Sequence, residues 1–216
     1  PNLLILGGTS QASRFAEAVA RDNINATLSY AGRVERVKPQ PIASRTGGFG
    51  GADGLADYII TQKITHLIDA THPFAAQISR NAIAAAEKAH IPVCALTRPP
   101  WHPQQGDKWH SVATVDEAVA WLNRPAMRVM LAIGRQNLPA FEAMPQHHYL
   151  LRLVDPPASP PQFPHHHIVI SRGPFDVESD VALITNHQIE VIVAKNAGGD
   201  GASAKLEAAR RCGAEV

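Results

Sequence analysis

The chain has 216 residues, of which 45% are hydrophobic, 18% charged and 6% aromatic. This length predicts one large domain or two small ones with a buried core. Lysine and arginine number 20 and aspartate and glutamate 19, so the formal charge of +1 argues against a nucleic-acid-binding protein that relies on bulk positive charge. Cys94 and Cys212 are too few for a disulfide framework. No apolar run approaches the ~20 residues that span a bilayer, so we expect a cytoplasmic protein without membrane partners.

Short apolar runs alternate with amphipathic stretches over residues 1–98, as they do in βαβ units. Such alternation indicates a parallel sheet covered on both faces. The predicted strands are 3–6, 27–30, 42–44, 66–70 and 93–96, and the predicted helices are 10–21, 54–61 and 74–89.

Prolines at positions 99, 100 and 103 interrupt this pattern, and we place a domain boundary there. The alternation then resumes, with strands predicted at 129–133, 149–154, 168–171 and 191–194 and helices at 116–122, 136–143, 175–186 and 202–211. Residues 214–216 look like the start of a further strand, so the second domain would lack its last strand. The predicted fold is α/β, with two Rossmann-like doubly wound domains, 1–98 for a dinucleotide and 99–216 for the substrate, and the active site in the cleft between them.

A glycine turn joins the first strand to the first helix through Gly7, Gly8, Thr9 and Ser10. Backbone N–H groups at a helix N-terminus bind phosphate, so this turn predicts a pyrophosphate site. Ala12 stands near the place of the third glycine of the dinucleotide fingerprint. The alternative is an ordinary βα turn with a Ser or Thr cap.

The end of the second strand discriminates between the two nicotinamide cofactors. An NAD site usually has an acidic residue there, whereas this chain has Ser29, Tyr30 and then Arg33. Because arginine makes forked, charge-assisted contacts to phosphate, this end favours NADPH over NADH. Arg36 is a competing candidate, and a plain surface arginine is the alternative.

Two further segments carry candidate ligand contacts. Arg45 leads into a glycine-rich loop that includes Gly47 and Gly48, which allows either close backbone approach to a ligand or a flexible loop. Thr71 and His72 follow the fourth strand, where ligands of open α/β sheets bind, and we expect them to line the cleft and to cap the next helix.

The second half places basic residues near strand ends, which predicts an anion-binding cleft; solvated surface charge is the alternative reading. These residues are Arg135, Arg152, Arg172 and Lys195, the last followed by Asn196 and two glycines. The histidines at 147, 148 and 165–167 are interpreted as solvated loop residues, and no metal site is predicted. The sequence has no Walker motif for an ATP site and no GxSxG nucleophile elbow. It also lacks a Tyr/Lys pair, which argues against a sugar-nucleotide epimerase or reductase.

Six segments in this order resemble the precorrin-6A reductase family of cobalamin biosynthesis. They are residues 5–10, 45–51, 69–75, 98–101, 171–175 and 195–199, the third reading Asp-Ala-Thr-His-Pro-Phe-Ala. The family usually has serine where this chain has Ala197. The resemblance implies NAD(P)H-dependent reduction of a ring-contracted tetrapyrrole rich in carboxylates, with hydride to carbon 19 and a proton to carbon 18. It also implies substrate exchange with neighbouring pathway enzymes.

The resemblance and the residue patterns together give each candidate a role. Gly7, Gly8, Thr9 and Ser10 would hold the pyrophosphate, Ser29, Tyr30 and Arg33 the adenosine phosphate, and Thr71 would contact the cofactor. Substrate contacts would come from Arg45, Gly47, Gly48, His72, Arg135, Arg172, Lys195 and Asn196, with Lys195 and His72 as catalytic candidates. The alternatives are an NADH-dependent cobalt-precorrin-6A reductase and a non-catalytic dinucleotide or tetrapyrrole sensor.

Overall fold

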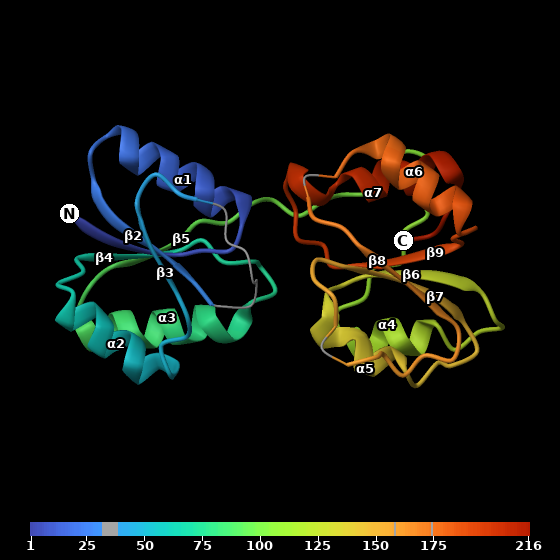
Figure 1. Cartoon of the computed structure of the whole chain (residues 1–216), viewed down its shortest axis with the longest axis horizontal. Coiled ribbons are helices and arrows are strands. Elements are labelled where there is room, and N and C mark those ends of the chain that lie inside the picture. The colour runs from blue at the N-terminus through green and yellow to red at the C-terminus, as the bar shows by residue number, and fades with distance from the viewer. Residues whose placement is uncertain (32–38, 158, 174) are drawn as a thin grey trace. The chain divides into compact units, whose positions relative to one another are not determined.

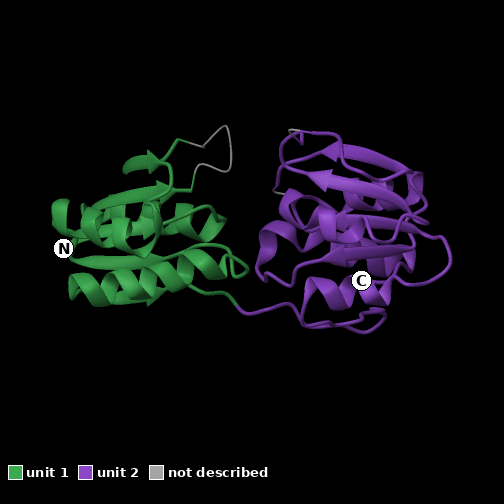
Figure 2. Cartoon of the chain, turned by 90° about the horizontal axis from the view of Figure 1, so that it is seen from below, with its two compact units in different colours: residues 1–98 green, residues 99–216 purple. Residues whose placement is uncertain are grey.

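The computed structural model describes residues 1–31, 39–157, 159–173 and 175–216 (Figure 1). The chain divides into two compact units, Pro1–Arg98 and Pro99–Val216 (Figure 2). Each unit has its own parallel sheet and its own hydrophobic core. Within the described ranges, no helix is both long and apolar enough to cross a membrane.

The first unit contains a five-stranded sheet in the order β3-β2-β1-β4-β5, with every described strand pair parallel. The order reverses direction between β1 and β4, which makes their carboxyl ends the switch point where ligands of such sheets bind. The elements are β1 (Asn2–Leu6), α1 (Ser10–Arg21), β2 (Asn25–Tyr30), β3 (Ala43–Thr46), α2 (Gly51–Thr61), β4 (His66–Asp69), α3 (Ala76–Ala89) and β5 (Val93–Ala95).

Alternate residues of β1 point to opposite faces of the sheet and pack into two separate parts of the core, because side chains alternate along a strand. Leu3 and Ile5 pack with the apolar stripe of α1, whereas Leu4 and Leu6 pack with α2 and α3. Figure 1 shows α1 on one side of the sheet and α2 and α3 on the other. The buried β1 therefore directs the chain rigidly into the glycine turn at its carboxyl end.

The second unit repeats this plan with a four-stranded parallel sheet in the order β8-β7-β6-β9. Helices α4 and α5 cover one face and α6 and α7 the other (Figure 1). The switch point lies between β6 and β9. The elements are α4 (Val115–Trp121), β6 (Arg128–Ala132), η1 (Arg135–Asn137), α5 (Leu138–Phe141), β7 (His148–Leu153), β8 (His166–Ile170), α6 (Val177–Asn186), β9 (Val191–Ala194), η2 (Asp200–Ala202) and α7 (Ala204–Cys212).

The predicted α/β fold class is confirmed, and several element ends differ. The single helix predicted at 136–143 is instead a 3-10 turn, η1, followed by the one-turn helix α5. Pro139 explains the difference, because a proline has no N–H to donate to the carbonyl four residues earlier. At the chain end, Glu215 forms a parallel bridge with Val191 of β9, in agreement with the predicted strand start.

Candidate functional site

The turn after β1 packs closely against the Leu28 side chain of β2. The Gly7 N–H donates to the Ser29 carbonyl at 2.8 Å. A Cβ at Gly7 would lie 2.6 Å from Cδ1 of Leu28, so only glycine fits without displacing the core. Gly8 has a φ of +114° and open space around it, which leaves room for a ligand next to the backbone.

Thr9 connects the two loops at the switch point of the first sheet. Its hydroxyl accepts the Ala12 N–H at 3.1 Å as the N-cap of α1, and it donates to the Ala70 carbonyl at 2.7 Å. Ser10 begins the helix, and the first turn carries no acidic residue. A capped helix N-terminus without nearby negative charge fits a phosphate group.

The ends of β2 and β3 place Arg45 beside Ser29. These two residues are register partners, and the Arg45 guanidinium donates to the Ser29 hydroxyl at 2.7 Å and to the Gly47 carbonyl at 3.0 Å. The same guanidinium lies 4.0 Å from the ring centre of Phe49. Arg45 is predicted among the substrate contacts, and the structure places its guanidinium beside Ser29, a candidate for the adenosine end of the cofactor. Arg33 and its competitor Arg36 lie outside the described residues.

Two further candidates, Tyr30 and Gly48, lie close to Arg45. Tyr30 is the last residue of β2, and Gly48 lies in the glycine-rich loop that follows Arg45. Burial raises the pKa of the Tyr30 hydroxyl, and hydrogen bonds with the side chains of Ser13 and Gln40 oppose the rise. The Gly48 carbonyl accepts from Arg45 at 3.4 Å. The end of β2 is therefore polar, and the Arg45 guanidinium beside it is fixed by its hydrogen bonds.

The segment after β4 has a different local structure from the one expected. The Thr71 hydroxyl donates to Oδ1 of Asp69 at 2.6 Å, and the His72 Nδ1 accepts the Phe74 N–H at 3.2 Å. The N-cap of α3 is Ala75, which makes no side-chain cap. The prediction that Thr71 and His72 cap this helix is therefore wrong, because their side chains bond within the loop. His72 is exposed and Thr71 half-buried beside the β1 turn.

In the second unit, Arg135 and Lys195 flank the switch point. Ala132 and Ala194 are register partners at the ends of β6 and β9, and Arg135 and Lys195 follow them closely in the chain. Arg135 is exposed and Lys195 half-buried. Two cations beside one switch point form a candidate site for anionic groups of a ligand.

Three other residues predicted to bind anions are held by partners within the unit. Arg172 forms an ion pair with Asp155 at 2.5 Å. Asn196 accepts the Trp101 N–H at 2.7 Å and donates to the Trp101 carbonyl at 2.8 Å, so its amide holds the backbone at Trp101. Arg152 was expected near the anion cleft, but it is buried against Asp180, which removes it from that role.

The interpretation of the histidines as solvated loop residues is correct only in part, because all except His147 are exposed but, of the exposed ones, only His165 lies in a loop outside the strands. His147 is buried, and its Nε2 lies 2.7 Å from the Leu122 carbonyl. His148 begins β7, and its ring stacks on His165 at 4.8 Å. His166 and His167 lie in β8, because their backbones pair with β7. In the part of the chain that the structure describes, no three potential ligands among His, Cys, Asp and Glu gather to hold a metal ion.

Comparison with known proteins decides the family. A family model described as precorrin-6x reductase CbiJ/CobK matches residues 2–216. The chain belongs to this family. Within it, a precorrin-6A reductase from Rhodobacter capsulatus is 52% identical over 214 residues, which cover 99% of this chain and 85% of that protein. A cobalt-precorrin-6A reductase from Priestia megaterium is 27% identical, over 99% of this chain and 88% of that protein.

The fold agrees with a solved member of the family. A structure described as CobK precorrin-6A reductase superposes with a TM-score of 0.96 and 52% identity, over 100% of this chain and 86% of that chain. The family resemblance read from the six segments is therefore confirmed, as is the assignment of the chain to the oxidoreductases.

Sequence reasoning missed one unusual side chain in this member of the CbiJ/CobK family. Lys205 is only 6% exposed and lies in α7 on the same buried stripe as Ala208 and Ala209. A lysine three and four residues before apolar core positions of a helix was the available signal.

Proposed function

We propose that the protein is an NADPH-dependent reductase of precorrin-6A in cobalamin biosynthesis. Hydride goes to carbon 19 and a proton to carbon 18, which gives dihydroprecorrin-6 and NADP⁺. The observation that supports this proposal most is the match of the family model to residues 2–216. A glycine turn before a capped helix N-terminus at the first switch point and basic residues at the second add to it.

The first unit contains the groups that fit the cofactor, which supplies the hydride when bound. The turn from Gly7 to Ser10 would hold the pyrophosphate on the α1 N-terminus, with Thr71 beside it. Arg45, held by Ser29, would contact the adenosine phosphate together with Tyr30 and Arg33. This set favours NADPH over NADH because no carboxylate ends β2.

The second unit contains the groups that fit substrate carboxylates. Arg135 and Lys195 would each bind one of these carboxylates, and Arg172 another in exchange for its pairing with Asp155. We expect Lys195 to lie near the reacting ring. Asn196 would act by holding this segment in place. His72, Gly47 and Gly48 in the first unit remain substrate-contact candidates.

The test is an assay of the purified protein with precorrin-6A or cobalt-precorrin-6A, each with NADPH or NADH. Nicotinamide absorbance at about 340 nm and the visible band of the macrocycle are followed together. We expect oxidation of NADPH that depends on metal-free precorrin-6A. Turnover of the cobalt complex alone would instead favour the cobalt-precorrin reductase, for which the Priestia megaterium relative is a precedent at lower identity. Tight binding of both ligands without oxidation would favour a sensor.

A further inference from the structure

Three charged side chains are buried together in the second unit. Arg152 in β7, Asp180 in α6 and Lys205 in α7 are 9%, 1% and 6% exposed. Nη2 of Arg152 lies 2.8 Å from Oδ1 of Asp180. The Lys205 ammonium donates to the Ala202 carbonyl in the turn before α7. The group therefore connects one strand and two helices near the carboxyl edge of the second sheet.

The charges in this group do not balance, since two cations share one carboxylate. Among the described residues, Nε of Arg152 and Oδ2 of Asp180 are buried without a hydrogen-bond partner. Burial lowers the pKa of Lys205 to about 8, with a further lowering by Arg152 and an opposing effect of Asp180. Because buried charges of this kind often stabilise a fold less than apolar residues of similar volume, stability alone does not account for them.

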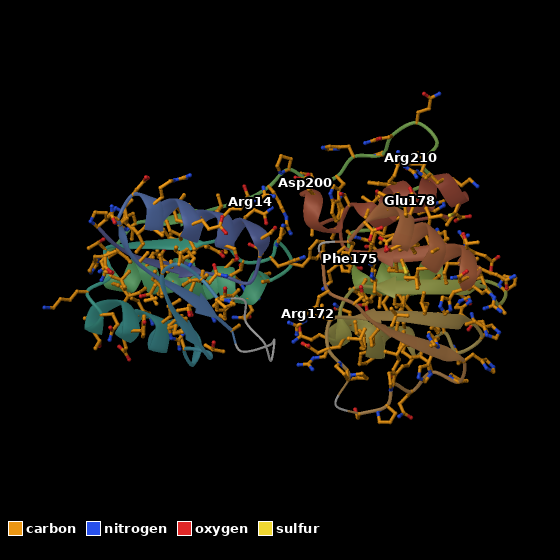
Figure 3. All side chains as sticks on the ribbon, turned by 45° about the horizontal axis from the view of Figure 1, so that its top comes forward. Arg14, Arg172, Phe175, Glu178, Asp200 and Arg210 are labelled. Atoms are coloured by element: carbon orange, nitrogen blue, oxygen red, sulfur yellow. The ribbon has the colours of Figure 1, made fainter. Side chains whose placement is uncertain are left out.

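The same side chains support the loops that carry the proposed substrate contacts. The Arg152 guanidinium lies 3.7 Å from the ring centre of Phe175, in the segment between β8 and α6 that also carries Arg172 (Figure 3). The Lys205 ammonium lies 4.7 Å from the ring centre of Trp101.

Trp101 connects Lys205 to the turn after β9. Its indole N–H donates to the Gly199 carbonyl at 2.8 Å, and its backbone exchanges two hydrogen bonds with the Asn196 amide. The turn that follows Lys195 is thus held at Asn196 and at Gly199 by one tryptophan, which itself rests on Lys205.

We propose that Arg152, Asp180 and Lys205 form a positioning cluster for recognition of the substrate's carboxylates. The cluster fixes the loops that carry Arg172, Lys195 and Asn196, and it places an uncompensated positive charge beneath them. None of its members touches substrate, so all three are positioning residues. The inference rests on the proposed function, because it takes the polycarboxylate precorrin-6A as the ligand of this edge.

The first test compares K205M and K205R with the wild type, with K108M, an exposed lysine of the same unit, as control. We expect K205M to bind precorrin-6A about tenfold more weakly by the visible band of the macrocycle, with NADPH affinity unchanged and K205R largely restored. The melting temperature of K205M at neutral pH should not fall, because below pH 8 the folded protein holds Lys205 as a buried cation at a cost.

The sign of this pH effect follows from the lowered pKa. Between about pH 8 and the ordinary value of 10.5, the unfolded chain keeps the Lys205 proton that the folded protein has lost, so stability rises with pH. K205M should lose this rise. A fall in melting temperature that accounts for the lost binding would overturn the proposal in favour of a purely structural role.

A second readout uses tryptophan emission and requires no turnover. Arg152 and Asp180 are the charged groups that act on Lys205, and the Trp101 ring covers it. Emission of the wild type should therefore titrate near pH 8, and both K205R and W101F should abolish this step. Unchanged titration in K205R would contradict the proposal.

The outcomes separate this proposal from the proposed function. If the wild type binds precorrin-6A without oxidising NADPH, the proposed function fails, and weaker binding by K205M still supports the cluster. If K205M binds precorrin-6A as tightly as the wild type, the cluster proposal is wrong whatever the turnover. If the wild type does not bind precorrin-6A, both are overturned.

Discussion

Thr9 shows how one side chain can shape a ligand site. Its hydroxyl both caps α1 and bonds the carbonyl of Ala70, so it sets the distance between the two loops of the first switch point. Arg45 has a similar double role, since it supports its own glycine loop and lies beside Ser29. Side-chain bonds of this kind give the candidate site its geometry before a ligand binds.

Replacing Thr9 with alanine removes both hydrogen bonds. We expect T9A to lower the free energy of unfolding by about 1–2 kcal/mol and to weaken NADPH binding several-fold. Urea unfolding and a binding titration measure the two effects. T114A is the matched control, because Thr114 caps α4 in the second unit. It should cost less stability, because it removes one exposed cap bond, and it should leave NADPH affinity intact; an equal loss of affinity in T114A would contradict this account.

The two arginines near the end of β2 are expected to discriminate between cofactors. R33A and R45M should each raise the KM for NADPH much more than the KM for NADH, because only NADPH has a phosphate on its adenosine ribose. Steady-state kinetics with both cofactors gives the ratio. If both KM values rise equally, neither arginine reads that phosphate.

Residue types alone could not show which cations have a carboxylate partner. The sequence placed Arg152 and Arg172 in one group with Lys195, whereas in the structure Arg152 is buried on Asp180 and Arg172 is paired with Asp155. Neither carboxylate is a near neighbour of its arginine in the sequence, so no local pattern predicts the pairing. The place of Arg45 beside Ser29 likewise depends on strand register, which only the folded sheet defines.

At the scale of elements, clear sequence patterns were sufficient to predict where some helices and strands begin and end. Helix α1 and strand β9 have the predicted ends, because a threonine cap and a short β-branched run mark them clearly. Helix α3 begins two residues later than predicted, since the side chains before it bond within their loop. The predicted helix at 136–143 failed for a local reason, the missing N–H of Pro139.

The contact between β1 and β2 at Gly7 gives a test at this scale. G7A places a Cβ 2.6 Å from Leu28, so we expect a loss of about 1–3 kcal/mol in unfolding free energy and weaker NADPH binding. In an L28A background the clash is absent, and G7A should then cost far less. Urea unfolding of the four proteins in this cycle measures the coupling. Additive effects would show that Gly7 is not constrained by Leu28.

The molecule as a whole consists of two units with similar sheets and different candidate ligands. The first carries the candidate phosphate-binding turn and the second carries basic residues at its switch point. Under the proposed function, this division would let a chain of formal charge +1 bind anionic ligands, since its cations are placed locally.

Each ligand should therefore protect mainly the unit that carries most of its candidate contacts. NADPH at about 100 times its Kd should stabilise the folded state by about 2.7 kcal/mol. In hydrogen exchange followed by mass spectrometry, we expect slower exchange in peptides covering 7–21 and 66–72. Precorrin-6A alone should slow exchange around 134–137 and 195–203. Protection by NADPH centred on the second unit would contradict the assignment of ligands to units.

The central claim is hydride transfer to the tetrapyrrole, and isotopic labelling tests it most directly. Purified protein would be incubated with precorrin-6A and NADPH carrying deuterium on one or the other face of nicotinamide carbon 4, and the product analysed by NMR. We predict one deuterium at carbon 19 from one of the two labelled cofactors, and no deuterium at carbon 18 from either. Product without deuterium from either cofactor, or no product, would contradict the account.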